Sequence, residues 1–272
     1  MFLTQKILNT KGQIDMAEYN KEKKHNENEP KGDVIFGRNP VSEAIRSGRA
    51  IDSLLIAKGA KTGAIVGILA KAKDKNIRIK EVDPKKLDYM CSGGTHQGIA
   101  AVAAVCEYKE LEDIFALAQE RGEDPFIVIL DEIEDPHNLG AIIRTAECAG
   151  AHGIIIPNRR SAGLSFTVGK TAAGAVEYVP VVRVPNIPSV IETLKERGLW
   201  VFGADMNGQD YRQCDFKGAV ALVIGNEGKG IGRLVREKCD VIVSLPMKGK
   251  INSLNASVAA GILMYKIADF KP

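Results

Sequence analysis

Residues 245–261 read LPMKGKINSLNASVAAG and pass from a short apolar segment through a polar loop into a helix. The apolar residues of this helix recur at helical spacing: Leu254, Val258, Ile262 and Tyr265. Ser253 and Asn255 therefore lie at or beside a helix N-terminus, where unpaired backbone N–H groups favour anions and polar ligands. An ordinary capped helix has the same pattern. The stretch therefore indicates a functional site only in combination with motifs earlier in the chain.

The length of 272 residues and the apolar content of 45% are enough for one or two hydrophobic cores. We expect a cytoplasmic protein without a membrane partner, because no stretch approaches the roughly 18 apolar residues of a membrane span and the start lacks a signal-peptide pattern. The five cysteines are scattered without a CxxC pair, which indicates reduced thiols. The four histidines lack metal-ligand spacing, so we expect no metal.

The net charge of +3 is unevenly distributed. Residues 33–109 carry 13 Lys and Arg against 8 Asp and Glu, and residues 110–124 carry 1 against 6. Residues 125–272 carry 17 against 15. The two folded parts are thus positive on both sides of an acidic segment, which suits a polyanionic partner, although a solvated charged surface gives the same excess.

Composition and breakers divide the chain into four parts. Residues 1–32 form a charged tail, 33–108 a small α/β domain, 109–124 an acidic linker and 125–272 a larger α/β domain. In the small domain the strands 51–57, 77–82 and 99–106 alternate with helices, which predicts parallel pairing.

The larger domain contains six strands that are apolar without alternation. They are expected at 126–130, 153–156, 179–184, 200–204, 220–224 and 241–244, with helices at 139–149, 187–197 and 231–238. Strands of this kind belong to a mainly parallel sheet covered on both faces.

Two glycine-rich patterns do not indicate nucleotide chemistry of the familiar kinds. Residues 163–171 resemble a phosphate-binding P-loop, but five residues separate the glycines where the motif needs four. The glycines at 225, 228, 230 and 232 lack dinucleotide-fingerprint spacing. The sequence therefore supports neither ATP nor nicotinamide chemistry.

Two further motifs join the opening stretch. Residues 135–146, DPHNLGAIIRTA, follow a strand, with Asn138 as the expected N-cap and Arg144 in the second turn of the helix. Residues 224–231, IGNEGKGI, follow another strand, and their glycines allow a backbone to approach a ligand closely. Loops that leave the carboxyl ends of parallel strands line one edge of the sheet, so the three motifs predict a polar, nucleotide-friendly pocket there.

In this order and spacing the three motifs resemble the signatures of the SpoU/TrmH family of the SPOUT superfamily, whose members are S-adenosyl-L-methionine-dependent RNA ribose 2′-O-methyltransferases. The small domain resembles the L30e-like substrate-binding domain of many members, including residues 36–41 and 96–99. Residues 135–138 and 160–162 are most similar to members that methylate a guanosine in large-subunit (23S-type) rRNA.

The resemblance implies an α/β-knot fold with a mainly parallel six-stranded sheet and a trefoil knot, an RNA partner and a homodimer built on the helix after Asn255. It implies S-adenosyl-L-methionine as the cofactor. The residues expected to hold it are Ile224, Gly225, Leu245 and Leu254. The expected catalytic residues are Asn138, Arg144, Glu227, Ser253 and Asn255. The candidates for phosphate contacts in the small domain are Arg38, Arg46, Arg49, Lys58 and Lys61, each of which is equally compatible with a solvated surface.

In the family that the chain resembles, the arginine matched by Arg144 is the catalytic residue and is often proposed as the base. A guanidinium stays protonated in proteins, so we favour a role in which Arg144 anchors a phosphate and stabilises a developing 2′-oxyanion. Rival hypotheses are the same reaction on a tRNA D-loop guanosine or an rRNA adenosine, and a non-catalytic RNA-binding assembly factor.

Overall fold

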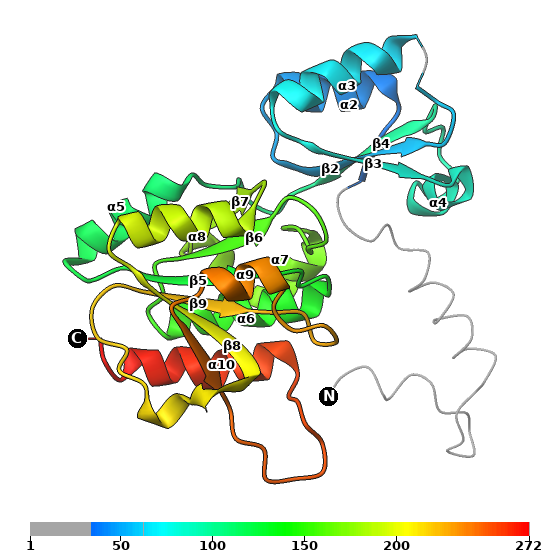
Figure 1. Cartoon of the computed structure of the whole chain (residues 1–272). Coiled ribbons are helices and arrows are strands. Elements are labelled where there is room, and N and C mark those ends of the chain that lie inside the picture. The colour runs from blue at the N-terminus through cyan, green and yellow to red at the C-terminus, as the bar shows by residue number, and fades with distance from the viewer. Residues whose placement is uncertain (1–33, 62, 272) are drawn as a thin grey trace, which may run out of the picture. The chain divides into compact units, whose positions relative to one another are not determined.

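The computed structural model describes residues 34–61 and 63–271, so the predicted tail, 1–32, lies outside the described residues. The chain divides into two compact units between Ala103 and Ala104 (Figure 1). Within the described part of the chain, no helix is long and apolar enough to cross a membrane.

The first unit contains a four-stranded mixed sheet in the order β1-β4-β2-β3. The strands are β1 (Val34–Phe36), β2 (Ile51–Ala57), β3 (Arg78–Val82) and β4 (Ile99–Ala103). Strands β2 and β3 pair in parallel, but β4 is antiparallel to both β1 and β2. The expectation of parallel pairing is therefore wrong for β4, because an apolar run does not encode the direction of a strand.

Helices cover both faces of this sheet. On one face α2 (Arg38–Arg46) and α3 (Ala64–Asp74) bury Val41 and Ile65. On the other, α4 (Pro84–Met90) buries Leu87. This unit has a small but complete core of its own.

The second unit contains a six-stranded sheet in the order β10-β8-β9-β5-β6-β7, and all its described strand pairs are parallel. Its strands are β5 (Phe126–Leu130), β6 (Gly153–Pro157), β7 (Val181–Val184), β8 (Trp200–Asp210), β9 (Val220–Ile224) and β10 (Val241–Ser244). The predicted α/β fold with a mainly parallel sheet is confirmed. The trefoil knot stays a prediction.

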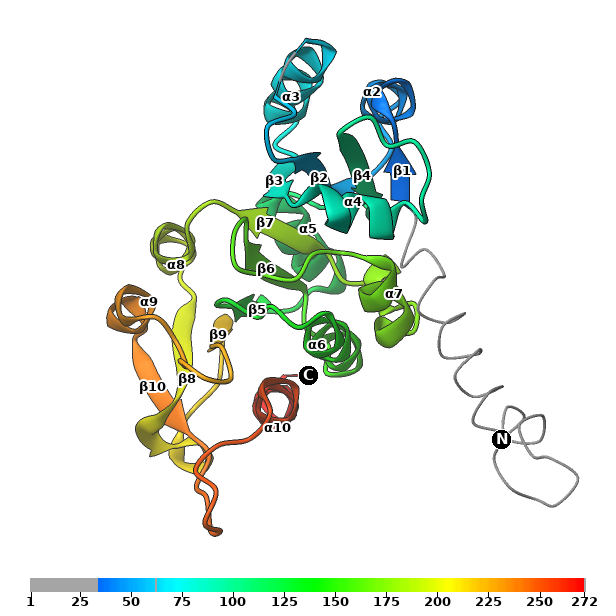
Figure 2. The ribbon, with the colours of Figure 1, turned by 90° about the vertical axis from the view of Figure 1, so that its right-hand side faces the viewer.

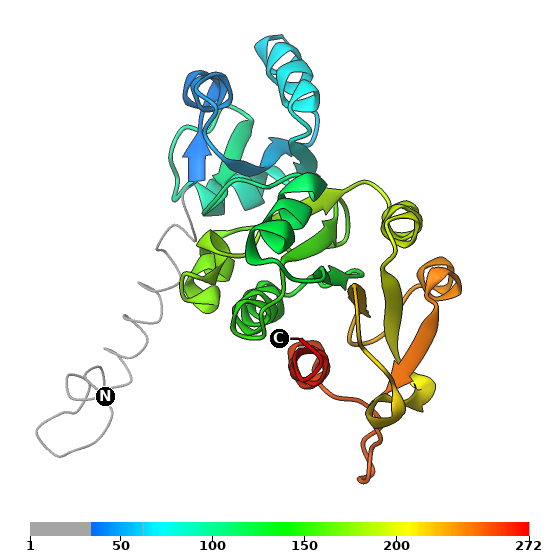
Figure 3. The ribbon, with the colours of Figure 1, turned by 90° about the vertical axis from the view of Figure 1, so that its left-hand side faces the viewer.

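Two layers of helices sandwich the second sheet. Helices α6 (Pro136–Cys148), α7 (Phe166–Ala172) and α10 (Ala256–Ala268) share one core cluster with the strands. Helices α5 (Leu111–Arg121), α8 (Ile187–Glu196) and α9 (Arg233–Lys238) contribute to the other. Figures 2 and 3 show α6, α7 and α10 on one side of the strands and α8 and α9 on the opposite side. Coverage on both faces explains why the strands are apolar throughout.

The segment expected as a linker, 109–124, differs from the prediction because most of it is α5. Ile114 on α5 is fully buried in the second core, and a capping box at Glu110 and Asp113 starts the helix. The acidic residues of α5 face solvent, and its apolar side packs into the core of the second unit. The acidic composition of the segment alone did not indicate this packing.

The P-loop-like stretch is also a helix. Gly169 and Lys170 lie inside α7 instead of in a loop before a helix. A Cβ on Gly140 of α6 would lie 2.6 Å from Cβ of Thr171, so the glycine allows α6 and α7 to pack closely. This geometry agrees with the rejection of an ATP-binding loop.

The N-cap of α6 is Asp135, not the predicted Asn138. Its side chain accepts a hydrogen bond from the His137 N–H at 2.8 Å, and Pro136 occupies the first helical position. Asn138 therefore lies in the first turn of the helix, where it is only 6% exposed. Its side chain is free to serve a purpose other than capping.

Candidate functional site

The three polar motifs meet at the carboxyl edge of the second sheet. One Glu227 oxygen, Oε1, accepts hydrogen bonds from the amide nitrogens of both Asn138 and Asn255, the latter at 2.8 Å. Asn255 Nδ2 also donates to Asn138 Oδ1 at 3.0 Å. These three residues, one from each motif, form the Asn–Glu–Asn cluster. The structure thus brings together three of the five predicted catalytic residues.

Asn255 also starts α10. Its Oδ1 accepts hydrogen bonds from the backbone N–H groups of Ser257 at 3.0 Å and Val258 at 3.3 Å, and from Ser257 Oγ at 2.6 Å. The predicted helix start is confirmed. Because the oxygen caps the helix, the amide nitrogen is fixed in the direction of the cluster.

A cavity of about 390 Å³ lies beside the cluster. All four predicted cofactor residues line it, together with Glu227 and Ser253. The predicted cofactor residues are Ile224, Gly225, Leu245 and Leu254. Its walls combine apolar side chains with the backbone of the glycine-rich loop, which suits a flat heterocycle attached to a polar group.

The glycine-rich loop folds tightly on itself at this cavity. A Cβ on Gly225 would lie 2.2 Å from the carbonyl carbon of Gly230. The backbones of Asn226 and Gly230 exchange two hydrogen bonds, at 3.0 and 2.8 Å. Only a residue without a side chain fits at position 225, because the backbone of Gly230 occupies the place of a Cβ.

Strand β8 supplies a further wall of the cavity, beyond the end of the strand predicted at 200–204. Its pairing with β10 jumps, since Ile242 is opposite Gly203 but Val243 is opposite Gln209. Residues 204–208 therefore leave the ladder, and residues 204–207 line the cavity. No motif marks this excursion, and the predicted strand ends where it begins.

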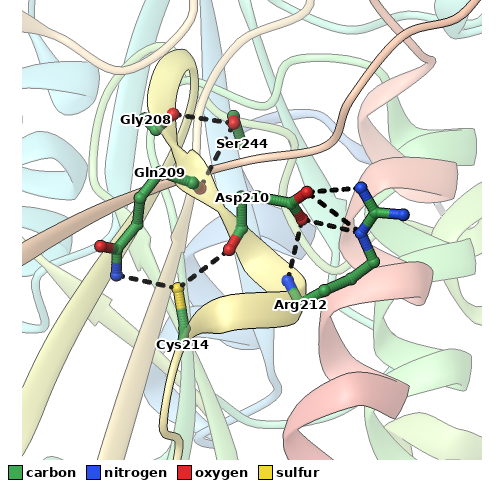
Figure 4. Close-up of polar contacts among 6 residues, drawn as sticks. All are labelled: Gly208, Gln209, Asp210, Arg212, Cys214 and Ser244. Atoms are coloured by element: carbon green, nitrogen blue, oxygen red, sulfur yellow. Dashed lines mark hydrogen bonds and ion pairs between the residues drawn. The ribbon is translucent and has the colours of Figure 1, made fainter.

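Figure 4 shows how the far end of this excursion is fastened. Ser244 Oγ on β10 donates to the backbone oxygens of Gly208 at 2.9 Å and Gln209 at 3.3 Å. A Cβ on Gly208 would lie 2.5 Å from the carbonyl oxygen of Ile242, which explains the close return of the chain. The excursion is thus a closed loop with a defined position.

Arg144 lies apart from the cluster. It is an exposed residue of α6, six positions after Asn138 and so about 9 Å further along the helix axis. With the residues that the structure describes it makes no hydrogen bond or ion pair, and it does not line the cavity. Its guanidinium is accordingly available for an external ligand.

The five predicted cations of the first unit lie at two ends of its sheet. Arg38 follows β1, and Lys58 and Lys61 follow β2, at the same end because both strands are antiparallel to β4. The other two, Arg46 and Arg49, lie between the end of α2 and the start of β2, at the opposite end. They therefore do not form one patch.

Two of these cations form ion pairs with carboxylates. Lys61 pairs with Glu81 at 2.7 Å and Arg46 with Glu43 at 2.9 Å. Gln97 Oε1 accepts a hydrogen bond from the Arg38 backbone N–H at 3.0 Å, which joins the segments 36–41 and 96–99. The end with Arg38, Lys58 and Lys61 thus contains both segments singled out in the sequence.

Thiol and metal chemistry have no support at this site. The five cysteines are free, and burial raises the pKa of Cys239 to about 12, so that thiol stays protonated. Among residues 34–61 and 63–271, no group of His, Cys, Asp and Glu side chains has the arrangement of a metal site.

A parallel sheet with a cavity at its carboxyl edge, a glycine-rich backbone wall and an adjoining polar cluster defines an α/β protein that binds a nucleotide-like ligand beside reactive polar groups. Residues 125–265 match the SpoU rRNA Methylase family, and residues 34–109 match the RNA 2′-O ribose methyltransferase substrate binding domain. The chain belongs to the SpoU rRNA methylase family.

Relatives and solved structures agree with this assignment. The chain is 50% identical over 236 residues to YacO of Bacillus subtilis (strain 168), designated a TrmH family tRNA/rRNA methyltransferase, covering 86% of this chain and 94% of the relative. AviRb, a SpoU methyltransferase from Streptomyces viridochromogenes solved with AdoMet, is 27% identical with a TM-score of 0.55, over 87% of this chain and 89% of AviRb. An AdoMet-bound rRNA methyltransferase from Sinorhizobium meliloti is 26% identical with a TM-score of 0.56, over 92% and 91%.

Proposed function

We propose that the chain transfers a methyl group from S-adenosyl-L-methionine to the ribose 2′-hydroxyl of a guanosine in large-subunit (23S-type) rRNA. The observation that carries the proposal is one cavity lined by all four predicted cofactor residues and adjoined by the Asn–Glu–Asn cluster. Membership of the SpoU family and the AdoMet-bound relatives support it.

The cavity suits S-adenosyl-L-methionine. Leu245 and Leu254 offer apolar contacts to an adenine, and Gly225, which also lines the cavity, contacts the ribose or the base. When bound, the cofactor supplies an electrophilic methyl group on a sulfonium. The protein has to align the 2′-oxygen with that methyl group and assist loss of its proton.

The chain's own residues divide this work. Arg144 anchors a phosphate of the RNA and stabilises the developing 2′-oxyanion, for which its guanidinium, exposed and without a partner among the described residues, is suited. Asn138 and Asn255 hold Glu227 in place, and Ser253, which lines the cavity, contacts the target nucleotide or the loop. The 2′-proton leaves to solvent or phosphate.

The RNA affinity of the first unit resides at the end of its sheet that carries Arg38, Lys58 and Lys61. These cations adjoin the segments 36–41 and 96–99, which are held together by the Arg38–Gln97 hydrogen bond. Phosphate contacts of this kind position RNA without reading its sequence.

The chain acts as a homodimer through α10. One face of α10 is buried, including Ala260, Leu263 and Ile267. The other presents an apolar stripe that is 38–54% exposed: Val258, Ile262 and Tyr265. A second copy would remove this stripe from water. Light scattering should give a dimer for the native chain and a monomer for Val258→Asp, whereas a stable native monomer would refute the dimer.

One experiment tests the reaction and its substrate. Labelled S-adenosyl-L-methionine is incubated with the protein and separate pools of large-subunit rRNA and tRNA, with Arg144→Ala as the control. We expect label in rRNA guanosine at the 2′-position, and loss of transfer but not of cofactor binding in Arg144→Ala. Label in tRNA alone would assign the tRNA substrate suggested by the name of the Bacillus relative. Absence of label from both pools would favour a non-catalytic RNA-binding role.

A further inference from the structure

A second cavity, of about 690 Å³, lies at the same carboxyl edge on the side of the sheet covered by α8 and α9. Its lining comes from the residues after β5, β6 and β7 and from the loop before α9. We call it the edge groove. Its charged residues are Asp131, Glu132, Arg159, Arg160, Lys229 and Arg233.

The two carboxylates of the edge groove are already engaged. Asp131 Oδ2 accepts a hydrogen bond from the Gly232 N–H at 2.7 Å, and burial raises the pKa of this carboxyl. Glu132 forms an ion pair with Arg160 at 2.9 Å. The groove therefore presents a net positive surface to a ligand.

Two cations of the groove have no side-chain partner within the described part of the chain. The side chains of Arg159 and Lys229 are exposed and form no hydrogen bond or ion pair with the residues at 34–61 and 63–271. Arg233, by contrast, pairs with Glu237 at 2.9 Å. Arg159 and Lys229 are therefore the groups through which the groove can bind an anion.

The backbone at the groove is held in an unusual conformation. Glu132 and Arg160, the two members of the ion pair, have φ values of +60° and +53°. Residues other than Gly, Asn and Asp rarely adopt this left-handed backbone conformation, and those that do cluster at functional sites. The Glu132 backbone oxygen also accepts a hydrogen bond from Asn226 Nδ2 at 3.0 Å. The groove is thus tied to the glycine-rich loop of the cofactor cavity.

The two cavities share a wall. Lys229 and Gly230 line both of them, so the loop 225–230 separates the cofactor cavity from the edge groove. An RNA strand whose target nucleotide lies beside the cofactor in the first cavity can therefore continue into the groove. Binding of a free mononucleotide would not require both the cofactor cavity and the edge groove.

We propose that the edge groove binds backbone phosphates of the RNA strand next to the methylated nucleotide, with Arg159 and Lys229 as the phosphate contacts. The Arg160–Glu132 pair positions the loop that presents Arg159. The inference rests on the proposed RNA substrate. Contacts of this type fix the register of the strand and make its binding sensitive to salt.

The test uses the full-length protein and transcribed 23S-type rRNA, with the variants Arg159→Glu and Arg159→Lys. Lys217→Glu is the matched control, because Lys217 is an exposed cation in the loop before β9, at the opposite edge of the sheet. RNA affinity is measured across a range of salt concentrations, alongside S-adenosyl-L-methionine affinity and the KM and kcat for methyl transfer.

We expect Arg159→Glu to weaken RNA binding about tenfold. It should also lower the slope of log affinity against log salt by about 1. It should raise the KM for RNA and leave cofactor affinity and kcat unchanged, while Arg159→Lys keeps the native slope.

Equal RNA affinity and slope in Arg159→Glu and the native chain would overturn the groove assignment. An equal loss in Lys217→Glu and Arg159→Glu would do the same, since it would indicate a general charge effect. Failure of the native chain to methylate any RNA would instead count against the proposed function.

Discussion

In the second unit Asn138, Glu227 and Asn255 hold one another by hydrogen bonds, whereas in the first unit Arg46 and Lys61 are exposed and each pairs with one carboxylate. The first arrangement fixes atoms in advance, and the second leaves long side chains free to adjust. Methyl transfer needs fixed geometry, whereas contact with RNA phosphates tolerates movement. The contrast predicts that substitutions in the second unit have the larger effects.

The sharpest test of this contrast is Gly225→Ala, for which we expect the largest effect. Its new Cβ would lie 2.2 Å from backbone at Gly230, so the loop has to shift and the cofactor cavity is distorted. S-adenosyl-L-methionine binding measured by calorimetry should be lost. Gly228→Ala is the control, because its Cβ would meet nothing closer than 3.6 Å. Equal cofactor affinity in both variants would show that the loop is not preorganised.

Removing the shared acceptor of the cluster should have the next largest effect. In Glu227→Ala the nearly buried Asn138 amide loses its acceptor, which should destabilise the fold by about 1–3 kcal/mol. We expect kcat to fall on the order of 100-fold. Glu227→Gln keeps an acceptor oxygen. Its stability in urea unfolding and its kcat in transfer assays should lie between those of the native chain and Glu227→Ala. An unchanged kcat in Glu227→Ala would remove the cluster from the site.

A pair of histidines compares the two units directly. His152 accepts the Phe126 N–H at Nδ1 and faces Glu123 at Nε2, and His96 repeats this pattern with Gly98 and Asp88. His152 is buried, and burial lowers its pKa because the charged ring would be desolvated. The unfolded chain therefore takes up this proton at a higher pH than the folded chain.

Neutral His152 therefore contributes its full stability at pH values above 6.5, the ordinary pKa of histidine. This contribution is lost as the pH falls below that value. Urea unfolding at pH 7.5 and 5.5 should show a smaller decrease in His152→Gln than in the native chain. An unchanged decrease in His152→Gln would contradict the assignment.

The smallest effects are expected in the first unit. Lys58→Ala should weaken RNA binding only a few-fold and lower the salt slope by about 1, because one phosphate contact is lost. Arg46→Ala, at the opposite end of the sheet and paired with Glu43, should leave both quantities unchanged. Filter binding at several salt concentrations measures this difference. A larger effect from Arg46→Ala would reverse the choice of end.

Much of the second unit could be predicted from the sequence because its strands are continuous apolar runs. The predicted bounds of β5, β9 and β10 agree with the structure. The helix start at Asn255 followed from its polar side chain before an apolar repeat, but the N-cap of α6 did not, since Asp135 before Pro136 is the stronger signal. The direction of β4 was missed because apolar spacing does not specify strand direction, and the helical spacing at 111–117 did not indicate that α5 packs into the second core.

The candidate site could be predicted only as a set of loops. The hydrogen bonds of the cluster join residues 89, 117 and 28 positions apart, and no local pattern encodes such pairings. The excursion of β8 and the Glu132–Arg160 pair depend likewise on contacts between distant strands. The types of the side chains indicated the candidate site residues, but the order of the strands in the sheet determines which of these residues are in contact.

Asn255 has a consequence for the order in which the molecule becomes active during synthesis. Its oxygen starts α10 and its nitrogen completes a cluster whose first member lies 117 residues earlier. A nascent chain that has folded every strand of the second sheet still lacks this residue's contacts until α10 has emerged and docked. On the proposed role of the cluster, methyl transfer requires a docked α10, so we expect a nascent chain that lacks α10 to be unable to modify RNA.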